Sequence, residues 1–467
     1  SLDSFYSMKR HMFIGLLALT LCLHAVEISN RAGTLIEVEI LEIEDTRIHI
    51  QMTNGQATWL DRARLSDESQ KTIKDKETRE QNEHEALNAI LGIGLFTDLN
   101  LWDDPSAAVA KRLSWPRESK TDSQSSFRYY PSANYRILKA RPYSAVLYGN
   151  SGKVEHVSIV FANKGDFKFS NPPSAGEISD MQRAIERDFE QIRNLLSEQF
   201  GEPDRQQFGT GRGIKQLIER WDWKSHAFIL ASKDGEYTGM KIMHSLVADN
   251  KGLGEKISDA ALRKLAVDNI IKKANGDVLV GNIPMVDQGP KGYCVPATFE
   301  RYLRYMQIPA DMYILAMAGQ TQVGGGTSLA KIIDAVDGYV GSQNRSMKEI
   351  GGEIKLRTVK KYVDEGLPII WTMFSSRKYN SFVNKRTTER LSVNDWKVWK
   401  DRSKNEARDI HLLKDFMSAH ACMIIGYNNK TEEIAVSDSW GPSYAVRWVP
   451  VDQIEQVSQG SIYLIDF

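Results

Sequence analysis

A cysteine at position 294 stands between a Gly/Pro-containing turn and a predicted helix, and this arrangement constrains the whole C-terminal part of the chain. The turn is residues 289–292, and Gln288 precedes the cysteine by six positions. Residues 294–306 carry apolar side chains at helical spacing, with Pro296 in the first turn, where a missing N–H costs nothing. Because a helix N-terminus favours the thiolate, this pattern predicts a nucleophilic Cys294 with a side-chain amide close by.

Two strands predicted near the C-terminus supply a partner for this thiol. Residues 420–427 and 433–437 are mainly apolar, and the polar residues 428–430 between them are typical of a turn. Paired as a hairpin, the strands would bring Asp438 close to His420. An acidic group at that point fixes the imidazole tautomer and stabilises the imidazolium, so the pair predicts a base for the thiol.

These four residues in this order, with the Asp-Ser-Trp-Gly sequence at 438–441, resemble the papain-like cysteine peptidases. The closer resemblance is to the compact bacterial branch related to bacteriocin-leader-processing peptidases, in which the third member of the triad is Asp. The resemblance covers residues 278–467. It implies an α+β fold in which a helix bearing the cysteine packs on an antiparallel β-sheet or barrel.

The resemblance also assigns roles. It implies that Cys294 is the nucleophile, His420 the base, Asp438 the orienting residue and Gln288 the oxyanion donor. It further implies that Trp440 shields the contact between Asp438 and His420 from water. The sequence departs from papain on both sides of the cysteine, and this leaves the substrate preference open.

Each assignment has a simpler alternative. A lone cysteine is most often a small buried hydrophobe, and His420 could be a structural histidine. Asp438 and Gln288 could be ordinary turn residues. His411 lies in a charged stretch and is expected at the surface. Cys422, two residues after His420 on the same strand face, is expected to be a packed thiol, with a reversible disulfide to Cys294 as the alternative.

Candidate substrate contacts lie close to these residues. They are Tyr293, Gly324, Gly325, Gly326 and Trp440. Flexible glycines allow an extended substrate backbone to approach closely. A glycine-rich loop before a helix can also hold phosphate, but this loop lacks the lysine spacing of a P-loop, and it could equally be a plain turn.

The N-terminus predicts export. Lys9 and Arg10 precede an apolar run at residues 12–23 and the small residue Ala25, which is the pattern of a secretory signal peptide over residues 1–25, with residues 1–7 as an upstream extension. Cys22 raises the alternative of a lipid anchor, although Leu21 is large for that motif. The expected location is periplasmic or secreted, in a bacterium, with no stable membrane span once the signal is removed.

The composition limits the classes of partner and cofactor that the chain is expected to bind. The 467 residues include 60 basic and 60 acidic side chains, so the net charge of zero favours neither nucleic acid nor an anionic membrane. Three cysteines argue against a disulfide scaffold. No Cys/His cluster has metal-ligand spacing, and the expected chemistry needs neither a metal nor another cofactor.

The rest of the chain divides into four segments. Residues 26–72 alternate as short strands and resemble the Sla-homology module, a small SH3-like barrel, which would bind a peptide or another domain; a structural β-hairpin cap is the alternative. Residues 73–90 are a charged helical linker, residues 91–247 an α+β domain without catalytic residues, and residues 248–277 a connector with a helix at 257–273. Residues 375–415 are expected to form an insertion that serves as a lid or exosite.

The predicted activity is therefore hydrolysis of peptide bonds in a peptide or protein substrate. Two rivals remain open. One is another thiol acyl-transfer enzyme on the same fold, such as a transpeptidase, amidase or deamidase. The other is a binding or scaffold protein whose peptidase-like domain only grips peptides.

Overall fold

The computed structural model describes residues 25–467 except 212, 234, 255, 324, 325, 352 and 413. The predicted signal segment therefore lies almost wholly outside the described residues. The chain divides into two compact units. One comprises the chain up to Ala89 with Phe96–Leu99, and the other comprises Ile90–Leu95 and Asn100–Phe467. No helix in the described part of the chain is long and apolar enough to cross a membrane.

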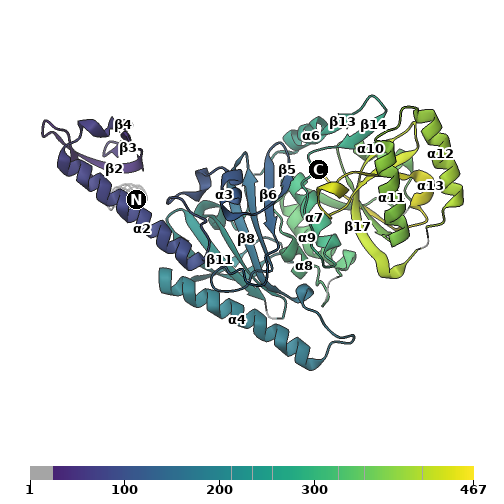
Figure 1. The fold of residues 1–467 in the computed structure, drawn as a ribbon, viewed down its shortest axis with the longest axis horizontal. Coiled ribbons are helices and arrows are strands. Elements are labelled where there is room, and N and C mark those ends of the chain that lie inside the picture. The colour runs from purple at the N-terminus through teal and green to yellow at the C-terminus, as the bar shows by residue number, and fades with distance from the viewer. Residues whose placement is uncertain are drawn as a thin grey trace, which may run out of the picture. The chain divides into compact units, whose positions relative to one another are not determined.

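The first unit is a four-stranded antiparallel sheet followed by a long helix (Figure 1). The strands are β1 (Ala25–Ser29), β2 (Leu35–Ile43), β3 (Arg47–Met52) and β4 (Ala57–Asp61). Alternation places Ile28, Val38, Ile48 and Ile50 in one small core, as expected for half-buried strands. The charged segment at 73–90 is helical, as predicted, within α2 (Asp67–Leu91).

The second unit begins with an eight-stranded antiparallel sheet, here called with its helices the upstream domain (residues 100–250). Its strand order is β5-β6-β7-β8-β12-β11-β10-β9. The strands are β5 (Arg117–Lys120), β6 (Gln124–Tyr129), β7 (Ser144–Asn150), β8 (Lys153–Asn163), β9 (Asp204–Phe208), β10 (Gln216–Trp223), β11 (His226–Lys233) and β12 (Tyr237–His244). The helices are α3 (Ser106–Leu113), α4 (Ala175–Phe200) and α5 (Ser245–Asp249), and a 3-10 turn, η3 (Lys164–Asp166), follows β8.

The two faces of this sheet have different neighbours. Helix α4 lies across one face (Figure 1) and buries Met181, Ile185, Ile192 and Leu196, which recur at helical spacing. A full capping box formed by Ser174 and Glu177 starts α4. The opposite face packs against helices of the next domain.

Residues 257–467, here called the C-terminal domain, are built on a second antiparallel sheet of order β13-β14-β17-β16-β20-β15, with β18 paired to β17 and β19. The strands are β13 (Ile270–Lys272), β14 (Asp277–Val280), β15 (Ser346–Glu349), β16 (Ile369–Phe374), β17 (Ala419–Asn428), β18 (Glu433–Ser437), β19 (Arg447–Pro450) and β20 (Ser458–Asp466). The helices are α6 (Asp259–Asp268), α7 (Cys294–Tyr305), α8 (Met312–Ala318), α9 (Leu329–Ser342), α10 (Leu356–Val363), α11 (Arg377–Arg390), α12 (Trp396–Asp409) and α13 (Val451–Ile454). This is the α+β arrangement expected for a helix bearing a cysteine beside an antiparallel sheet.

Two segments differ from the sequence expectation. The helix expected at 257–273 ends at Asp268, and its last residues form β13, which pairs with β14. The predicted insertion at 375–415 contains α11 and α12. Arg386 and Arg390 of α11 are buried against the carboxylate of Glu433 on β18, so α11 is anchored to the sheet by ion pairs.

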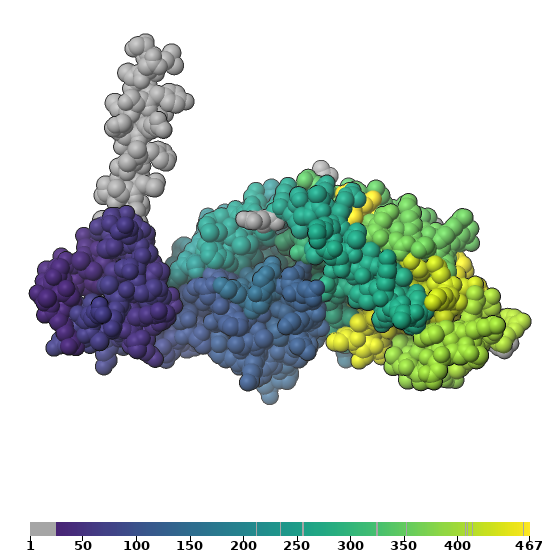
Figure 2. All heavy atoms as spheres, turned by 90° about the horizontal axis from the view of Figure 1, so that it is seen from above, coloured from purple at the N-terminus to yellow at the C-terminus, as the bar shows by residue number. Residues whose placement is uncertain are grey.

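The upstream and C-terminal domains share a core. Val160 of β8 packs with Tyr293, Ala297, Met312 and Tyr313 in one buried cluster. In Figure 2 the blue-to-teal surface of the upstream domain and the green-to-yellow surface of the C-terminal domain meet along a broad seam. The predicted boundary between residues 247 and 278 is therefore a chain connection within one compact unit.

Candidate active site

Cys294 begins α7, as the sequence predicts, and it is partly accessible to solvent. The helix packs one side against β17, so the thiol lies beside the start of that strand. The backbone N–H groups of Val295 and Ala421 both interact with the sulfur and favour its ionised form. A thiol at this helix end is therefore placed where a negative charge is stabilised.

His420 is the second residue of β17, and Asp438 follows directly after β18. Antiparallel pairing of the two strands brings the side chains together: Nε2 of His420 lies 2.9 Å from Oδ1 of Asp438. Both residues are buried. Because Nε2 is engaged by the carboxylate, Nδ1 is the ring nitrogen left to interact with the thiol of Cys294.

The electrostatics of these groups favour a thiolate–imidazolium pair. Burial raises the pKa of Cys294, but the hydrogen bond and charge of His420 outweigh it, so the pKa lies below its usual value. Burial lowers the pKa of His420, but Asp438 and Cys294 together raise it to about 9. The histidine therefore holds a proton at neutral pH, and the lowered pKa of the thiol favours its ionised form.

Arg447 of β19 completes the support of the carboxylate. Its Nε and Nη2 donate to Oδ2 of Asp438 at 2.8 and 2.6 Å, while Nη1 donates to the side-chain oxygens of Asn380 and Asn384 on α11. Burial raises the pKa of Asp438, but His420 and Arg447 hold it below its usual value. The carboxylate therefore stays ionised while its other oxygen remains free for the histidine.

Trp440 covers this contact. Its ring stacks on the His420 ring with centroids 4.6 Å apart and an interplanar angle of 28°. The Arg447 guanidinium also lies over the Trp440 ring, 5.3 Å from the ring centroid. The position suits shielding of the ion pair from water, because excluding water strengthens electrostatic contacts.

Gln288 lies in the turn before α7 and is buried. Its backbone N–H donates to the carbonyl of Ser439 at 2.9 Å, which ties this turn to the loop that carries Asp438. The side-chain Nε2 donates one hydrogen to the carbonyl of Lys291 at 3.1 Å. An amide nitrogen has two hydrogens, so a second remains available for another acceptor.

Residues 280–463 match the model of the Peptidase_C39 like family. This region is a domain of the cysteine-peptidase type. The match begins after the upstream domain and contains the four residues described above. No curated protein matches the chain.

The other predicted contacts are placed differently. Tyr293 is fully buried, and its hydroxyl bonds to the upstream domain, which does not fit the predicted contact with substrate. Gly324 and Gly325 lie outside the described residues. Gly326 has a φ of +96° with open space around it, and its N–H donates to the carbonyl of Gly292. A glycine is required there by the backbone conformation.

The remaining cysteine and histidine of this domain are in the expected settings. Cys422 is 1% exposed within the main core and is a free thiol, as is Cys294. Burial raises the pKa of Cys422 well above its usual value. His411 is exposed. The pattern of a packed thiol and a surface histidine is thus found in the structure.

Two functional neighbours escaped the sequence analysis. Arg447 lies nine residues after the carboxylate that it holds. Arg301 of α7 is 1% exposed and donates to the side chains of Ser437 and Ser439 at 2.5 and 3.3 Å, so it joins the helix of the thiol to the strand of the acid. A buried arginine on an apolar helix face was the available signal, because such a charge requires partners.

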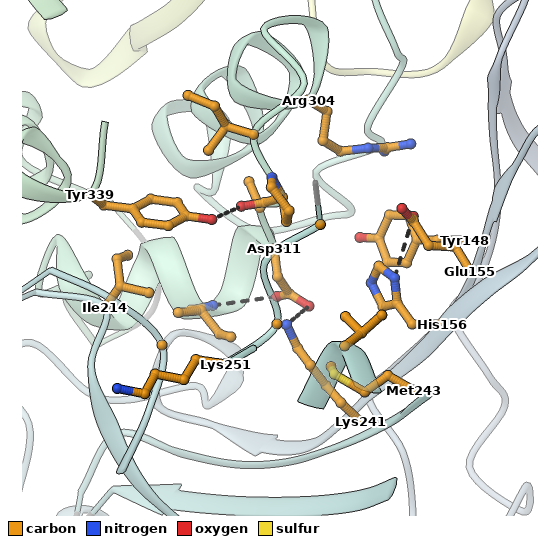
Figure 3. A pocket seen from close by; sticks show the side chains of 18 of the residues that line it. Tyr148, Glu155, His156, Ile214, Lys241, Met243, Lys251, Arg304, Asp311 and Tyr339 are labelled. Carbon is orange, nitrogen blue, oxygen red and sulfur yellow. Dashed lines mark hydrogen bonds and ion pairs between the residues drawn. The ribbon is translucent and has the colours of Figure 1, made fainter. Parts of the chain in front are cut away.

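A separate cavity of about 380 Å³ lies at the far, C-terminal end of α7, between the two domains (Figure 3). Its wall includes Lys241 and His156 of the upstream domain and Arg304 and Asp311 of the C-terminal domain. Asp311 accepts a hydrogen bond from Ser158 at 2.6 Å and lies 3.7 Å from Lys241. Its lining includes neither the thiol nor the residues bonded to it.

Proposed function

We propose that the protein is a cysteine peptidase that hydrolyses peptide bonds. The observation that carries the proposal is the position of the His420 ring, which bonds Asp438 on one side at 2.9 Å and the Cys294 thiol on the other. The match of residues 280–463 to a peptidase family supports the same reaction class. A catalytic triad with Gln288 as oxyanion donor is the finer form of this proposal.

In this mechanism the Cys294 thiolate attacks the carbonyl carbon of the scissile bond and forms a tetrahedral intermediate. The Gln288 side-chain N–H and the Cys294 backbone N–H stabilise its oxyanion. The His420 imidazolium then gives its proton to the leaving amine as the C–N bond breaks, which leaves a thioester on the sulfur. Neutral His420 takes a proton from water, and the hydroxide releases the acid product and the thiolate.

In this mechanism Asp438 holds His420 in the orientation and charge state that the reaction needs. Its negative charge stabilises the imidazolium and fixes which ring nitrogen faces the sulfur. Arg447 neutralises the second carboxylate oxygen, so Asp438 does not compete for the proton that His420 must deliver. Trp440 supports the same arrangement by covering the ring.

Export and partner binding are further parts of the proposal, supported by sequence alone. The apolar run at 12–23 after two basic residues supports a secretory signal. Fractionation of the producing cells tests export: retention of an uncleaved chain in the cytoplasm contradicts it.

A truncation tests the role of the N-terminal module. A chain beginning at residue 90 should keep hydrolysis of short peptides if the module recognises partners rather than completes the site.

The central test is mass spectrometry of a peptide library incubated with the wild type and with Cys294→Ala. New amino termini with the wild type, and none with the variant, are the expected result. Products in which an acyl group has moved to another amine identify a transpeptidase instead. Release of ammonia without chain cleavage identifies an amidase or deamidase.

A peptide-binding protein gives another outcome. It cleaves nothing, and Cys294→Ala keeps the affinity of the wild type for the same peptides. Labelling by a peptide that carries an electrophilic carbonyl separates these cases, because only an activated thiol reacts under reducing conditions.

A further inference from the structure

The turn that carries Gln288 is held at both ends by the upstream domain. This segment, residues 287–293, is here called the oxyanion turn. It connects Asp287, which follows the buried Val286, to Tyr293, the residue before the thiol. The contacts at its two ends come from different elements, namely the β5–β6 edge and the η3 turn after β8.

At the first end the upstream domain bonds both backbone groups of Asp287. Oε1 of Glu118 on β5 accepts the Asp287 N–H at 2.7 Å, and the Tyr130 hydroxyl donates to the Asp287 carbonyl at 2.7 Å. Gly289 has a φ of +69°, and a Cβ added there would lie 2.9 Å from the Tyr130 ring. The turn and the tyrosine are therefore fitted to one another.

Glu118 is itself fixed in the interior of the upstream domain. Its Oε1 accepts Nε of Arg128 at 2.6 Å, and its Oε2 accepts the hydroxyl of Ser126 at 2.8 Å. All three residues are buried. A carboxylate held by a buried arginine cannot move without exposing an uncompensated charge, so it gives the turn a rigid acceptor.

At the second end the Tyr293 hydroxyl lies 2.7 Å from Oδ1 of Asn163 and 2.8 Å from Oδ1 of Asp166. A Cβ added to Gly165 would lie 2.2 Å from this hydroxyl, so the η3 turn closes directly on the tyrosine. The Gly165 N–H donates to the same Asn163 oxygen at 2.9 Å, which fixes that oxygen as an acceptor.

The Tyr293 hydroxyl has one hydrogen for two acceptor contacts. Two oxygen–oxygen contacts join Asn163, Tyr293 and Asp166, and each needs one hydrogen. The tyrosine supplies one, and the Asn163 oxygen has none to give. Protonation of Asp166 would supply the second hydrogen, with the tyrosine then donating to Asn163.

We propose that the upstream domain is a working part of the peptidase site, in which neutral Asp166 is a positioning residue that holds Tyr293 and thereby the oxyanion turn and the thiol. This proposal rests on the proposed function, because positioning is defined by the reaction. It makes the upstream domain necessary for full activity. It also makes activity depend on the proton of Asp166.

The surroundings of Asp166 agree with a retained proton. Burial is the main cause that raises its pKa to about 7, and the hydroxyls of Tyr293 and Tyr143 and the charge of Lys291 oppose it only in part. Tyr313 of α8 also lies close to the carboxyl. The Oδ2 atom of Asp166 and the hydroxyl of Tyr143 are both buried. An acid with this pKa is neutral below about pH 7 and charged above it, so the second end of the turn loosens as pH rises.

The first experiment measures kcat against pH for the best library peptide, using the wild type, Asp166→Asn, Asp166→Ala and Asp188→Asn. Asparagine keeps a neutral donor, so in Asp166→Asn the alkaline loss should move from about pH 7 towards about 9, where His420 loses its proton. Asp166→Ala should lower kcat about tenfold at pH 6, as expected for one buried hydrogen bond. Asp188 on α4 is the matched control, because burial also raises its pKa but it lies on another element.

The second experiment needs no catalysis. Amide hydrogen exchange at pH 6 should be faster over residues 287–293 in Asp166→Ala than in the wild type or Asp188→Asn. Equal exchange in all three, or an unchanged alkaline limb in Asp166→Asn, overturns the positioning role. Faster exchange in a protein whose wild type cleaves no peptide would leave the contact intact and reject the peptidase function alone.

Discussion

Cys294 and Cys422 belong to the same domain and are both free thiols, one on α7 beside β17 and the other within β17, yet the pKa values of the two thiols shift in opposite directions. The pKa of Cys294 is held below its usual value by His420, whereas burial raises the pKa of Cys422 well above it. Cys422 lies two residues after His420, so nearness along the strand is not the cause. Of these two cysteines, only Cys294 has a direct hydrogen bond to a charged imidazole, and only Cys294 stands at a helix N-terminus.

The largest expected difference between the two thiols is in reactivity. At pH 7 iodoacetamide should modify Cys294 at least about 10²-fold faster than Cys422, because the thiolate is the nucleophile and Cys422 is sealed in the core. Mass spectrometry of the two peptides measures this ratio. His420→Ala should slow the labelling of Cys294, since only the backbone N–H groups of Val295 and Ala421 then oppose the rise in its pKa that burial causes. Equal labelling in the wild type would contradict the thiolate–imidazolium pair.

The next effect concerns the support of that pair. Arg447→Met leaves the Asp438 carboxylate buried without its two guanidinium bonds, which should lower the free energy of unfolding by about 3–5 kcal/mol. Arg402→Met removes two ion pairs that are more exposed, those of Arg402 with Glu406 and Glu389, and should cost about 0–1 kcal/mol. Urea denaturation compares them. A loss in Arg447→Met no greater than in Arg402→Met would mean that the carboxylate does not depend on this arginine.

Cys294, His420 and Asp438 could be predicted from the sequence because each stands at the end of a helix or strand with a clear hydrophobic pattern. Cys294 opens a helix after a turn, His420 enters an apolar strand, and Asp438 follows the strand that pairs with it. Local periodicity and one hairpin were enough to bring them together. Gln288 shares this property, since its turn adjoins the helix.

A second group of site residues could not be found in this way, because its contacts cross the chain. Asp166 lies 127 residues from Tyr293, and Glu118 lies 169 residues from Asp287. From the sequence, Tyr293 is therefore predicted to contact substrate beside the thiol, although the upstream domain buries it. The strand β5 that carries Glu118 is short and polar, with the sequence Arg-Glu-Ser-Lys, so neither its existence nor its role had a hydrophobic pattern to predict it.

A further variant distinguishes formation of the thiolate from its use in peptide hydrolysis. Gln288→Ala should lower kcat for peptide hydrolysis by about 10²–10³, because one oxyanion donor is lost. Its rate of alkylation by iodoacetamide should stay that of the wild type, since alkylation forms no oxyanion. Gln307→Ala, at the other end of α7, is the control for both measurements. Slower alkylation in Gln288→Ala would show instead that the turn shapes the thiol itself.

The smallest expected effect belongs to Cys422. Cys422→Ala should leave kcat unchanged and lower the free energy of unfolding by about 1 kcal/mol, because it removes one small buried group. Cys422→Ser should cost more, since it places a hydroxyl in an apolar core. This ranking follows from packing alone. If Cys422→Ala instead lost kcat while keeping its stability, the two thiols would share a catalytic role, and the assignment of Cys294 as the sole nucleophile would have to be revised.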